Sequence, residues 1–223
     1  MSQPKHSSHL ALRSTFFAHR ALLRDVELLH RSLQALSGYS SEQLLRLQKW
    51  YLQFRKLLER HHQAEDHVLF QELERRSGSP SEAIEDIEAE HQHLQFLLDE
   101  IQGLLHCAVA EGQRNINLLQ QRGIALLELM RSHIASEERL VVNMMNARWS
   151  HDDQWQLESK LRRQDPFAYQ VYYVPWVEDR LNSEERHHLY RLVPWYVCWA
   201  VRWWGRPQFR HRWRTLEELP KAA

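Results

Sequence analysis

The sequence predicts an all-α protein, an up-down-up-down antiparallel four-helix bundle with a C-terminal extension of short helices. Glycine and proline are scarce, at six and seven of 223 residues, whereas helix-favouring Leu, Gln, Glu and Arg are abundant. Apolar residues recur at spacings of three and four along the first two thirds, as they do on one face of an amphipathic helix. Short turns separate these stretches, and such connections join antiparallel neighbours in a bundle.

The first two helices are marked by apolar periodicity and by end signals. One helix is expected over residues 15–36, where apolar side chains share a face, and Ser37-Gly38 ends it. Ser40 and Gln43 then form a capping-box pattern. This pattern opens a second helix that is expected to reach about Arg76.

The third helix has three agreeing start signals. Ser79 is the expected N-cap, Pro80 suits the first helical position, and Glu82 is the capping-box partner. Gly112 is expected to end this helix, and a fourth begins near Asn115.

The motif His-x-x-x-Glu occurs on the second helix, at His61 and Glu65, and on the fourth, at His133 and Glu137. Four residues turn an α-helix by about 40°, so both side chains of a pair lie on one face. Two such helices facing each other could close a site around two metal ions. With 15 histidines and 21 glutamates in the chain, however, roughly 1.4 such pairs are expected by chance. The spacing alone is therefore no evidence.

The heights of these residues along the bundle are more informative. Antiparallel neighbours bring residues to the same height when they are equally far from the intervening turn. By this count, six residues fall within about two helical turns of one another: His19, His61, Glu65, His91, His133 and Glu137. His30, His93 and His106 do not meet the test, because they lie far along their helices or point away.

Apolar residues surround these six positions. They share helix faces with the four histidines and predict an inward-facing site: Phe16, Phe54, Leu58, Leu94, Leu98, Leu126 and Met130. A buried imidazole or carboxylate without a partner costs several kcal/mol, whereas a bound metal satisfies it. A single histidine is more often a structural residue, but six ligand-type residues at one level favour a metal site.

The first and third helices each carry one of these histidines, and the second and fourth each carry a His-x-x-x-Glu pair. This pattern, over roughly residues 15–148, resembles the hemerythrin-like (HHE cation-binding) family. The resemblance implies that His19, His61, His91 and His133 are imidazole ligands of two non-haem Fe ions, an oxo- or hydroxo-bridged pair. It also implies that the carboxylates bridging the two irons are Glu65 and Glu137. Centres of this family bind or react with oxygen, peroxide or nitric oxide, or sense iron.

Two positions differ from the oxygen-carrying hemerythrins. Those proteins have a further histidine where this chain has Gln95, and they use His-x-x-x-x-Asp where this chain has the pair ending at Glu137. Both differences argue against reversible oxygen transport, because a missing nitrogen ligand leaves a more open position that suits peroxide or oxygen chemistry or sensing. His62 and Asp66 are displaced around the second helix, and we expect them to support the ligands or to face solvent.

A ferritin-like di-iron arrangement is the competing interpretation. Such bundles carry Glu-x-x-His on two helices, and the chain contains Glu59-x-x-His62 and Glu88-x-x-His91. These motifs lie 19 and 10 residues from Gly78, so their glutamates do not face each other. We therefore disfavour this register.

Composition excludes some classes of function. Lysine plus arginine balances aspartate plus glutamate at 29 each, so no net charge directs the chain to nucleic acid or to a membrane. Two cysteines do not make a disulfide framework or a zinc site and fit a reducing compartment. Residues 1–14 are expected to be a loose lead without the apolar core of a secretory signal. These features predict a cytoplasmic protein.

The extension, residues 149–223, differs in composition from the bundle. Ser150 is expected to start a short helix that reaches about Gln164, before the break at Asp165-Pro166. Asn182 caps another helix that ends before Pro194.

Aromatic and basic residues dominate this extension. It holds eight of the nine tryptophans: Trp149, Trp155, Trp176, Trp195, Trp199, Trp203, Trp204 and Trp213. Residues 186–214 include seven arginines and no acidic residue, a pattern that could suit a membrane surface or an acidic protein partner. We favour the alternative that the tryptophans pack against the bundle and close a substrate channel. Residues 192–204 are too few to span a bilayer.

Three classes of function remain open. The first is a di-iron protein that binds or senses a small diatomic ligand or iron, and the second is a di-iron enzyme that decomposes peroxide. The third is a metal-free helical adaptor that docks through its Trp/Arg-rich tail. The sequence does not decide between the first two.

Overall fold

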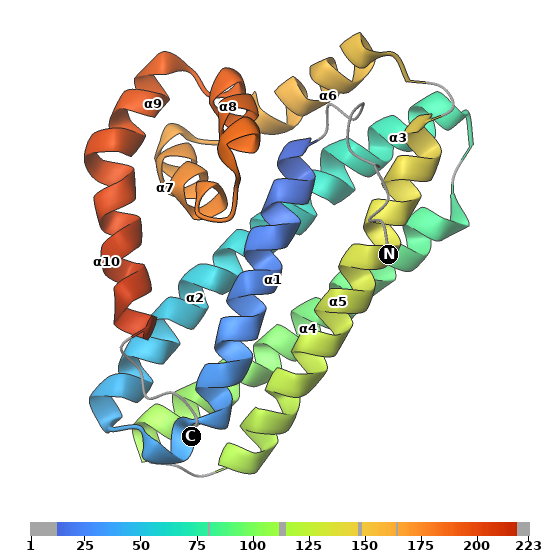
Figure 1. Ribbon diagram of the computed structural model, residues 1–223. Coiled ribbons are helices and arrows are strands. Elements are labelled where there is room, and N and C mark those ends of the chain that lie inside the picture. Colours follow the sequence, from blue (N-terminus) through green and yellow to red (C-terminus); the bar gives the residue numbers. More distant parts are fainter. Residues whose placement is uncertain (1–12, 80, 112–114, 147–148, 164, 218–223) are drawn as a thin grey trace, which may run out of the picture.

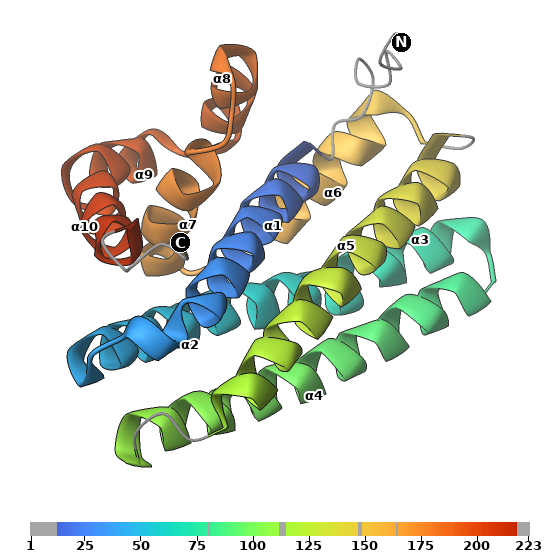
Figure 2. The same cartoon turned by 60° about the horizontal axis from the view of Figure 1, so that its bottom comes forward.

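The computed structural model describes residues 13–79, 81–111, 115–146, 149–163 and 165–217, and within these ranges every regular element is helical. Four long helical stretches lie side by side (Figures 1 and 2). They are α1 (Arg13–Gln34), α2 (Ser41–Ala64) with its continuation, α4 (Glu82–Glu111) and α5 (Ile116–Asn146). Contacts of α1 with α2, α2 with α4, α4 with α5 and α5 with α1 close these helices into a ring.

The second stretch is one long rod with an irregularity in the middle. After α2, the chain forms a π-helical turn, η2 (Glu65–Leu69), and continues as α3 (Phe70–Ser77). The capping box at its start is confirmed, because the Gln43 N–H donates to Ser40 Oγ and the Ser40 N–H donates to Gln43 Oε1. π-turns inside helices are frequent at functional sites, and this one begins at a candidate ligand.

The start of α4 differs from the prediction. The helix begins at Glu82, after Ser81, rather than at Pro80, which lies outside the described residues together with Gly112. Gly78, in the left-handed region with φ of 81°, ends α3, and the Glu74 carboxylate accepts the N–H of Ser81 at 2.9 Å.

Two apolar clusters fill the interior. The larger one runs along α1, α2, α4 and α5 toward the turn at Gly38 and includes residues of the extension. The smaller one lies at the other end, around Phe70, Ile87 and Val141. The predicted ligand residues lie between the two clusters, so each end of the candidate site is closed by packed side chains.

The extension consists of short helices that lie beside α1 and α2 (Figure 1). They are α6 (His151–Arg163), α7 (Phe167–Glu178), α8 (Ser183–Leu192), α9 (Trp195–Ala200), the π-turn η3 (Val201–Gly205) and α10 (Arg206–Glu217). The cap at Ser150 and the capping box at Asn182 are both present. None of the described helices is long and apolar enough to cross a membrane.

Five tryptophans of the extension fall at the extremes of exposure, whereas Trp149 and Trp155 are intermediate and the side chain of Trp213 lies outside the described part of the structure. Trp176 is buried, and its indole N–H donates to Asp25 Oδ2 of α1 at 2.8 Å. In contrast, four tryptophans are at least half exposed: Trp195, Trp199, Trp203 and Trp204. The prediction that the tryptophans pack against the bundle is wrong for these four, because the inward face of α9 and η3 is taken by small and β-branched residues.

Candidate metal centre

Two groups of potential ligand atoms lie inside the bundle. The first is formed by His19 from α1, His61 from α2, Glu65 from η2 and Glu137 from α5. Within this group, one ligand atom from each residue lies within 4.8 Å of the others. The bundle therefore brings two imidazoles and two carboxylates to one point.

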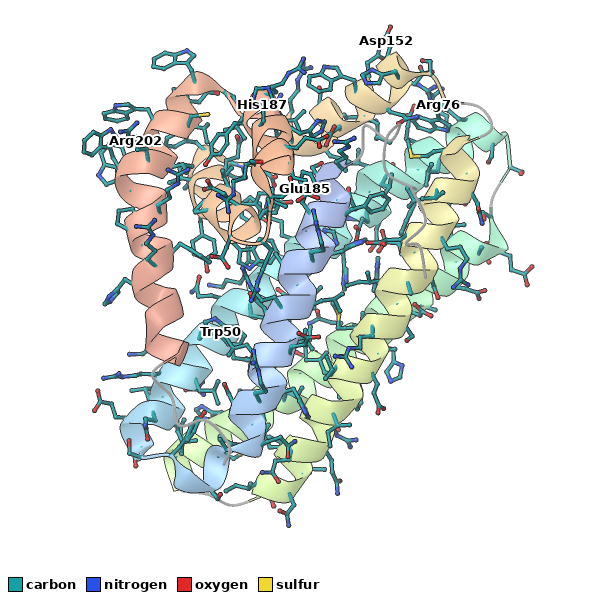
Figure 3. The ribbon with its side chains drawn as sticks, in the orientation of Figure 1. Trp50, Arg76, Asp152, Glu185, His187 and Arg202 are labelled. Carbon is teal, nitrogen blue, oxygen red and sulfur yellow. The ribbon has the colours of Figure 1, made fainter. Side chains whose placement is uncertain are left out.

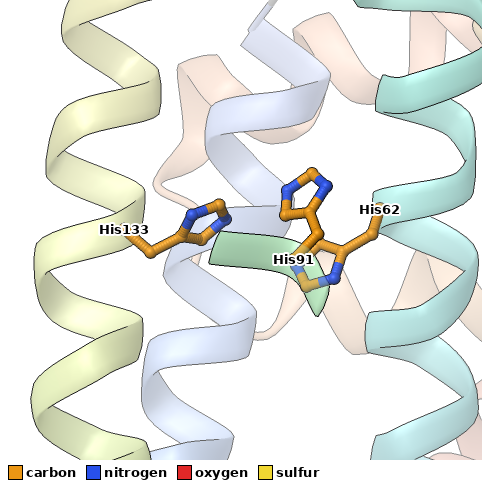
Figure 4. Close-up of side chains that lie close together, drawn as sticks. All are labelled: His62, His91 and His133. Atoms are coloured by element: carbon orange, nitrogen blue, oxygen red, sulfur yellow. The ribbon is translucent and has the colours of Figure 1, made fainter. Parts of the chain in front are cut away.

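The second group meets the same distance criterion and consists of histidines alone. His62 from α2, His91 from α4 and His133 from α5 converge from three helices (Figure 4). The His62 ring is stacked on the His91 ring, with centroids 3.9 Å apart and an interplanar angle of 10°. All three side chains are buried.

The two carboxylates lie between these groups. Glu65 Oε1 is 3.0 Å from His61 Nε2, and Glu65 Oε2 is 4.0 Å from His91 Nε2. Glu137 Oε2 is 3.3 Å from His19 Nε2 and 3.6 Å from His133 Nε2. Each carboxylate thus reaches histidines of both groups, as a carboxylate shared by two cations would.

Outer carboxylates orient three of the histidines. The Nδ1 atoms of His19, His91 and His133 lie 3.0, 2.7 and 2.9 Å from carboxylate oxygens. The three acceptors are Glu138, Asp66 and Glu90. A hydrogen bond to Nδ1 fixes the tautomer and leaves the Nε2 lone pair free to bind, which is the usual arrangement of metal-binding histidines.

The inward atoms have no hydrogen-bond partners. They include Nε2 of His19, His61, His62 and His91 and both carboxylate oxygens of Glu65 and of Glu137. Buried polar atoms are nearly always paired, and each unpaired one costs about 1–3 kcal/mol. Bound cations would satisfy the whole set, so the residues present fit a pair of metal ions.

Burial also sets the protonation of the site. Burial, with His91 nearby, lowers the pKa of His133 to about 4, and burial lowers the pKa of His62 well below its usual value. Burial raises the pKa of Glu137, and the neighbouring Glu65 carboxylate raises it further. His133 and His62 are therefore neutral at pH 7, which is the form that binds metals. For His19 and His91, neighbouring carboxylates outweigh burial and raise the pKa.

The structure brings all six predicted residues together and adds a seventh, His62. The expectation for Asp66 agrees with its bond to His91, but His62 does not face solvent and its ring lies among the other histidines. The only signal in the sequence was the His-His doublet at the start of the motif. Gln95 does not join the site, because its side-chain amide donates to Glu59.

The ferritin-like register is not formed. Glu59 lies on the outer side of the rod, where it pairs with Arg55 at 2.5 Å. Glu88 is not in either ligand group, and its side chain is only partly buried. The histidines of these two motifs instead belong to the second group.

A cavity of about 90 Å³ adjoins the site. His61, Ala64 and Glu65 form its wall on the side of the ligands, and residues of α6, α7 and α8 form much of the rest. One of them, Tyr173, is partly buried, and desolvation together with the charges of Asp165, Glu65 and Glu158 raises its pKa. Its hydroxyl group therefore stays protonated beside the candidate centre.

Comparisons with known proteins agree with this geometry. The family model described as the hemerythrin HHE cation binding domain matches residues 15–145. The zinc finger protein BRUTUS of Arabidopsis thaliana is 24% identical over 184 residues, which cover 80% of this chain and 14% of that protein. The chain thus spans about one seventh of the length of this relative. No solved structure matches the chain.

Proposed function

Because the chain belongs to the hemerythrin HHE cation-binding domain family, we propose that it is a non-haem di-iron protein that binds, senses or reacts with oxygen, peroxide or nitric oxide. The observation that carries this proposal is the set of unpartnered inward atoms on seven converging side chains. His19 and His61 would hold one iron, and the second would be held by His62, His91 and His133. Glu65 and Glu137 would lie between the two.

The ligand types support iron. The set contains imidazole and carboxylate groups and no thiolate, which suits non-haem iron and disfavours softer ions. We propose that the ligands are carried by a bundle of the up-down-up-down type. Cys107 and Cys198 are free, in keeping with the reducing, cytoplasmic setting that we also propose.

The chain's own groups would prepare the site for small ligands. An iron pair, when bound, supplies electrons and open coordination positions to such a molecule. Glu138, Asp66 and Glu90 hold the imidazole rings in one tautomer, so little reorganisation is needed on binding. The apolar clusters at both ends exclude water, and the cavity beside His61 and Glu65 offers room for a ligand of a few atoms.

Metal analysis tests this proposal directly. After anaerobic loading with ferrous iron and desalting, we expect two irons per chain and near-ultraviolet charge-transfer absorption once oxygen is added. Glu137→Ala should lose this iron, whereas Glu128→Ala, on the exposed face of the same helix, should keep it. Wild-type protein that retains no iron would refute the proposal.

A second candidate function is an enzyme that decomposes peroxide. It is favoured by the cavity against two of the ligands, because a site with an open position and a pocket can turn over. We expect steady oxygen release from peroxide that disappears in Glu65→Ala. Stoichiometric bleaching of the iron without turnover would leave the binding or sensing function.

The metal-free adaptor makes the opposite prediction about stability. A ligand that binds only the folded state raises the melting temperature, so removing iron with a chelator should lower it by several degrees. The adaptor predicts no change. Differential scanning calorimetry of the loaded and the chelated protein distinguishes the two.

A further inference from the structure

A few charged residues lie among the mostly apolar side chains that line the cavity beside the candidate metal centre. Its lining includes four charged residues besides Glu65: Arg60, Glu158, Arg162 and Asp165. Arg60 and Asp165 neutralise each other, with Arg60 Nε 2.8 Å from Asp165 Oδ1. Glu158 and Arg162, one helical turn apart on α6, are therefore the charged groups that remain to meet a ligand.

Neither of these two side chains is fully paired. Glu158 is 1% exposed; its Oε1 accepts the N–H of Ser14 at 3.0 Å, but its Oε2 has no hydrogen-bond partner. The nearest cation-forming atom to Oε2 is His188 Nε2, at 3.9 Å. Arg162 Nε is also buried and has no partner among the described residues. The cavity thus offers an unpaired carboxylate oxygen and an unpaired guanidinium N–H.

From this pairing we infer that the cavity is a binding pocket for hydrogen peroxide, which can donate an O–H to Glu158 and accept from Arg162. An apolar diatomic gas cannot satisfy either group. Leaving a buried charged group unmatched costs more than the loss of an ordinary hydrogen bond, so the pocket favours the polar ligand. The inference rests on the proposed di-iron function, because the pocket delivers its ligand to the wall formed by His61 and Glu65.

Rates with two oxidants test the pocket. In the ferrous-loaded protein, Arg162→Met and Glu158→Leu should each lower the second-order rate constant for oxidation by peroxide by about tenfold, the effect of one hydrogen bond to a charged group. The rate constant for oxidation by oxygen should stay within about twofold, because that ligand makes neither bond. Glu158→Gln, which keeps the side-chain shape, should have a smaller effect than Glu158→Leu. Arg163→Met and Gln156→Leu, on the exposed face of the same helix, are the matched controls.

Azide binding to the oxidised protein provides a readout that does not depend on turnover. Azide is an anion, so Arg162→Met should weaken its binding, whereas Glu158→Leu should strengthen it by removing a like charge. If the variants lose the peroxide and oxygen rate constants equally, or change neither, the assignment of the pocket to peroxide is wrong. Wild-type protein without iron would refute the di-iron function instead, and unchanged iron content in the variants separates the two failures.

A second and independent feature is an aromatic surface on the outer side of the extension. Its members are at least half exposed: Phe167 at 51%, Trp195 at 81%, Tyr196 at 50%, Trp199 at 54%, Trp203 at 60% and Trp204 at 52%. Ring contacts join Tyr196 to Phe167 and to Trp195, with centroids 6.1 and 6.0 Å apart, and join Trp199 to Trp204, with centroids 5.0 Å apart. We call these six residues the aromatic surface.

The aromatic surface is basic as well as apolar. Arg191, Arg202 and Arg210 are exposed, and Figure 3 shows Arg202 on the side of the extension away from the bundle. The Glu178 carboxylate is already taken by Arg206, at 2.6 Å. No acidic residue occurs in residues 186–214. Residues 186–214 therefore combine exposed tryptophans with exposed arginines and no acidic residue.

These properties fit the surface of a membrane that contains anionic lipids, and we propose that the aromatic surface docks there. Tryptophan prefers the boundary between headgroups and acyl chains, and each arginine is attracted to anionic lipid. A second copy of the chain fits less well, because a two-fold contact would bring like charges together. Since no described helix can cross a bilayer, the contact would be made from one side.

Sedimentation with vesicles tests the docking. The full chain should bind vesicles of phosphatidylcholine with phosphatidylserine and bind less to phosphatidylcholine alone, with a blue shift of tryptophan fluorescence. Replacing Trp195, Trp199 and Trp203 together by serine should abolish binding, and Arg191→Gln with Arg202→Gln should weaken it several-fold. Phe96→Ser is the control, because Phe96 is 63% exposed on α4, outside the aromatic surface.

Two outcomes would overturn the proposal. One is failure of the wild-type chain to sediment with either vesicle. The other is a dimer in sedimentation velocity that the triple tryptophan variant dissociates while vesicle binding stays the same, which would assign the aromatic surface to self-association.

Discussion

The centre of the bundle and the aromatic surface of the extension both depart from the usual rule that apolar side chains are buried and charged ones exposed. The centre buries ionisable side chains such as Glu65 and Glu137, at 2% and 0% exposure, whereas the extension exposes rings such as Trp195, at 81%. Folded proteins generally avoid both, because buried charge and exposed aromatic area cost free energy. Outer hydrogen bonds order the polar interior, whereas ring contacts join members of the aromatic surface. This difference fits our two proposals, a bound metal pair for the first region and an external surface for the second.

The largest expected effect is the loss of iron affinity when one of the two shared carboxylates is removed. Glu65→Ala and Glu137→Ala should each remove a ligand of both ions, so the loss of iron affinity should exceed the roughly 10- to 100-fold typical of outer partners. Iron per chain, measured after desalting, should fall from two to less than one. If iron content is unchanged, the polar interior is not organised around metal and the comparison fails.

These carboxylates were accessible from the sequence because their positions follow from turn distances. Counting residues from the intervening turns placed His19, His61, His91 and His133 at one level, and the structure brings their side chains together. The capping boxes at Ser40 and Asn182 were also predictable, since each depends on two residues three apart. Local chemistry and helix geometry were sufficient for these features.

Other features depend on tertiary packing and could not be predicted. His62 was missed because a helical wheel assumes one inward direction, whereas the residues of two ligand groups occupy a wide arc of α2. The π-turn from Glu65 adds a residue to one turn, which shifts the side-chain directions that follow. The outward tryptophans were mispredicted because composition does not specify which face of a helix is buried.

A substitution of His62 tests whether this histidine is a ligand of the second ion. His62→Ala should lower the affinity for the second ion by on the order of 100-fold, because it removes a direct ligand. This is the upper end of the range for hydrogen-bond partners of ligands. Gln95→His in that background should restore part of the binding, since residue 95 follows His91 by one turn. Isothermal titration under anaerobic conditions measures both. An unaffected second ion in His62→Ala would exclude this histidine from the site.

The third prediction concerns the outer carboxylates. Glu90→Ala and Glu138→Ala should weaken iron binding by roughly tenfold, because His133 and His19 lose the acceptor that fixes their tautomer. Glu128→Ala, an exposed residue of α5, is the control. Competition with a calibrated chelator measures the change, and equal affinities for all three variants would show that the outer hydrogen bonds do not prepare the site.

The smallest expected effect compares an inner with an outer tryptophan of the same extension. Trp176→Phe removes the indole N–H that donates to Asp25 Oδ2, while Asp25 stays buried at 2% exposure and keeps its bond to Arg24. Because a buried acceptor loses one donor, the free energy of unfolding should fall by about 1–3 kcal/mol. Trp203→Phe should change it by less than about 0.5 kcal/mol, because Trp203 is 60% exposed. Urea denaturation of both variants gives the difference. A stability loss in Trp203→Phe as large as that in Trp176→Phe would mean that the aromatic surface stabilises the fold and is not reserved for an external contact.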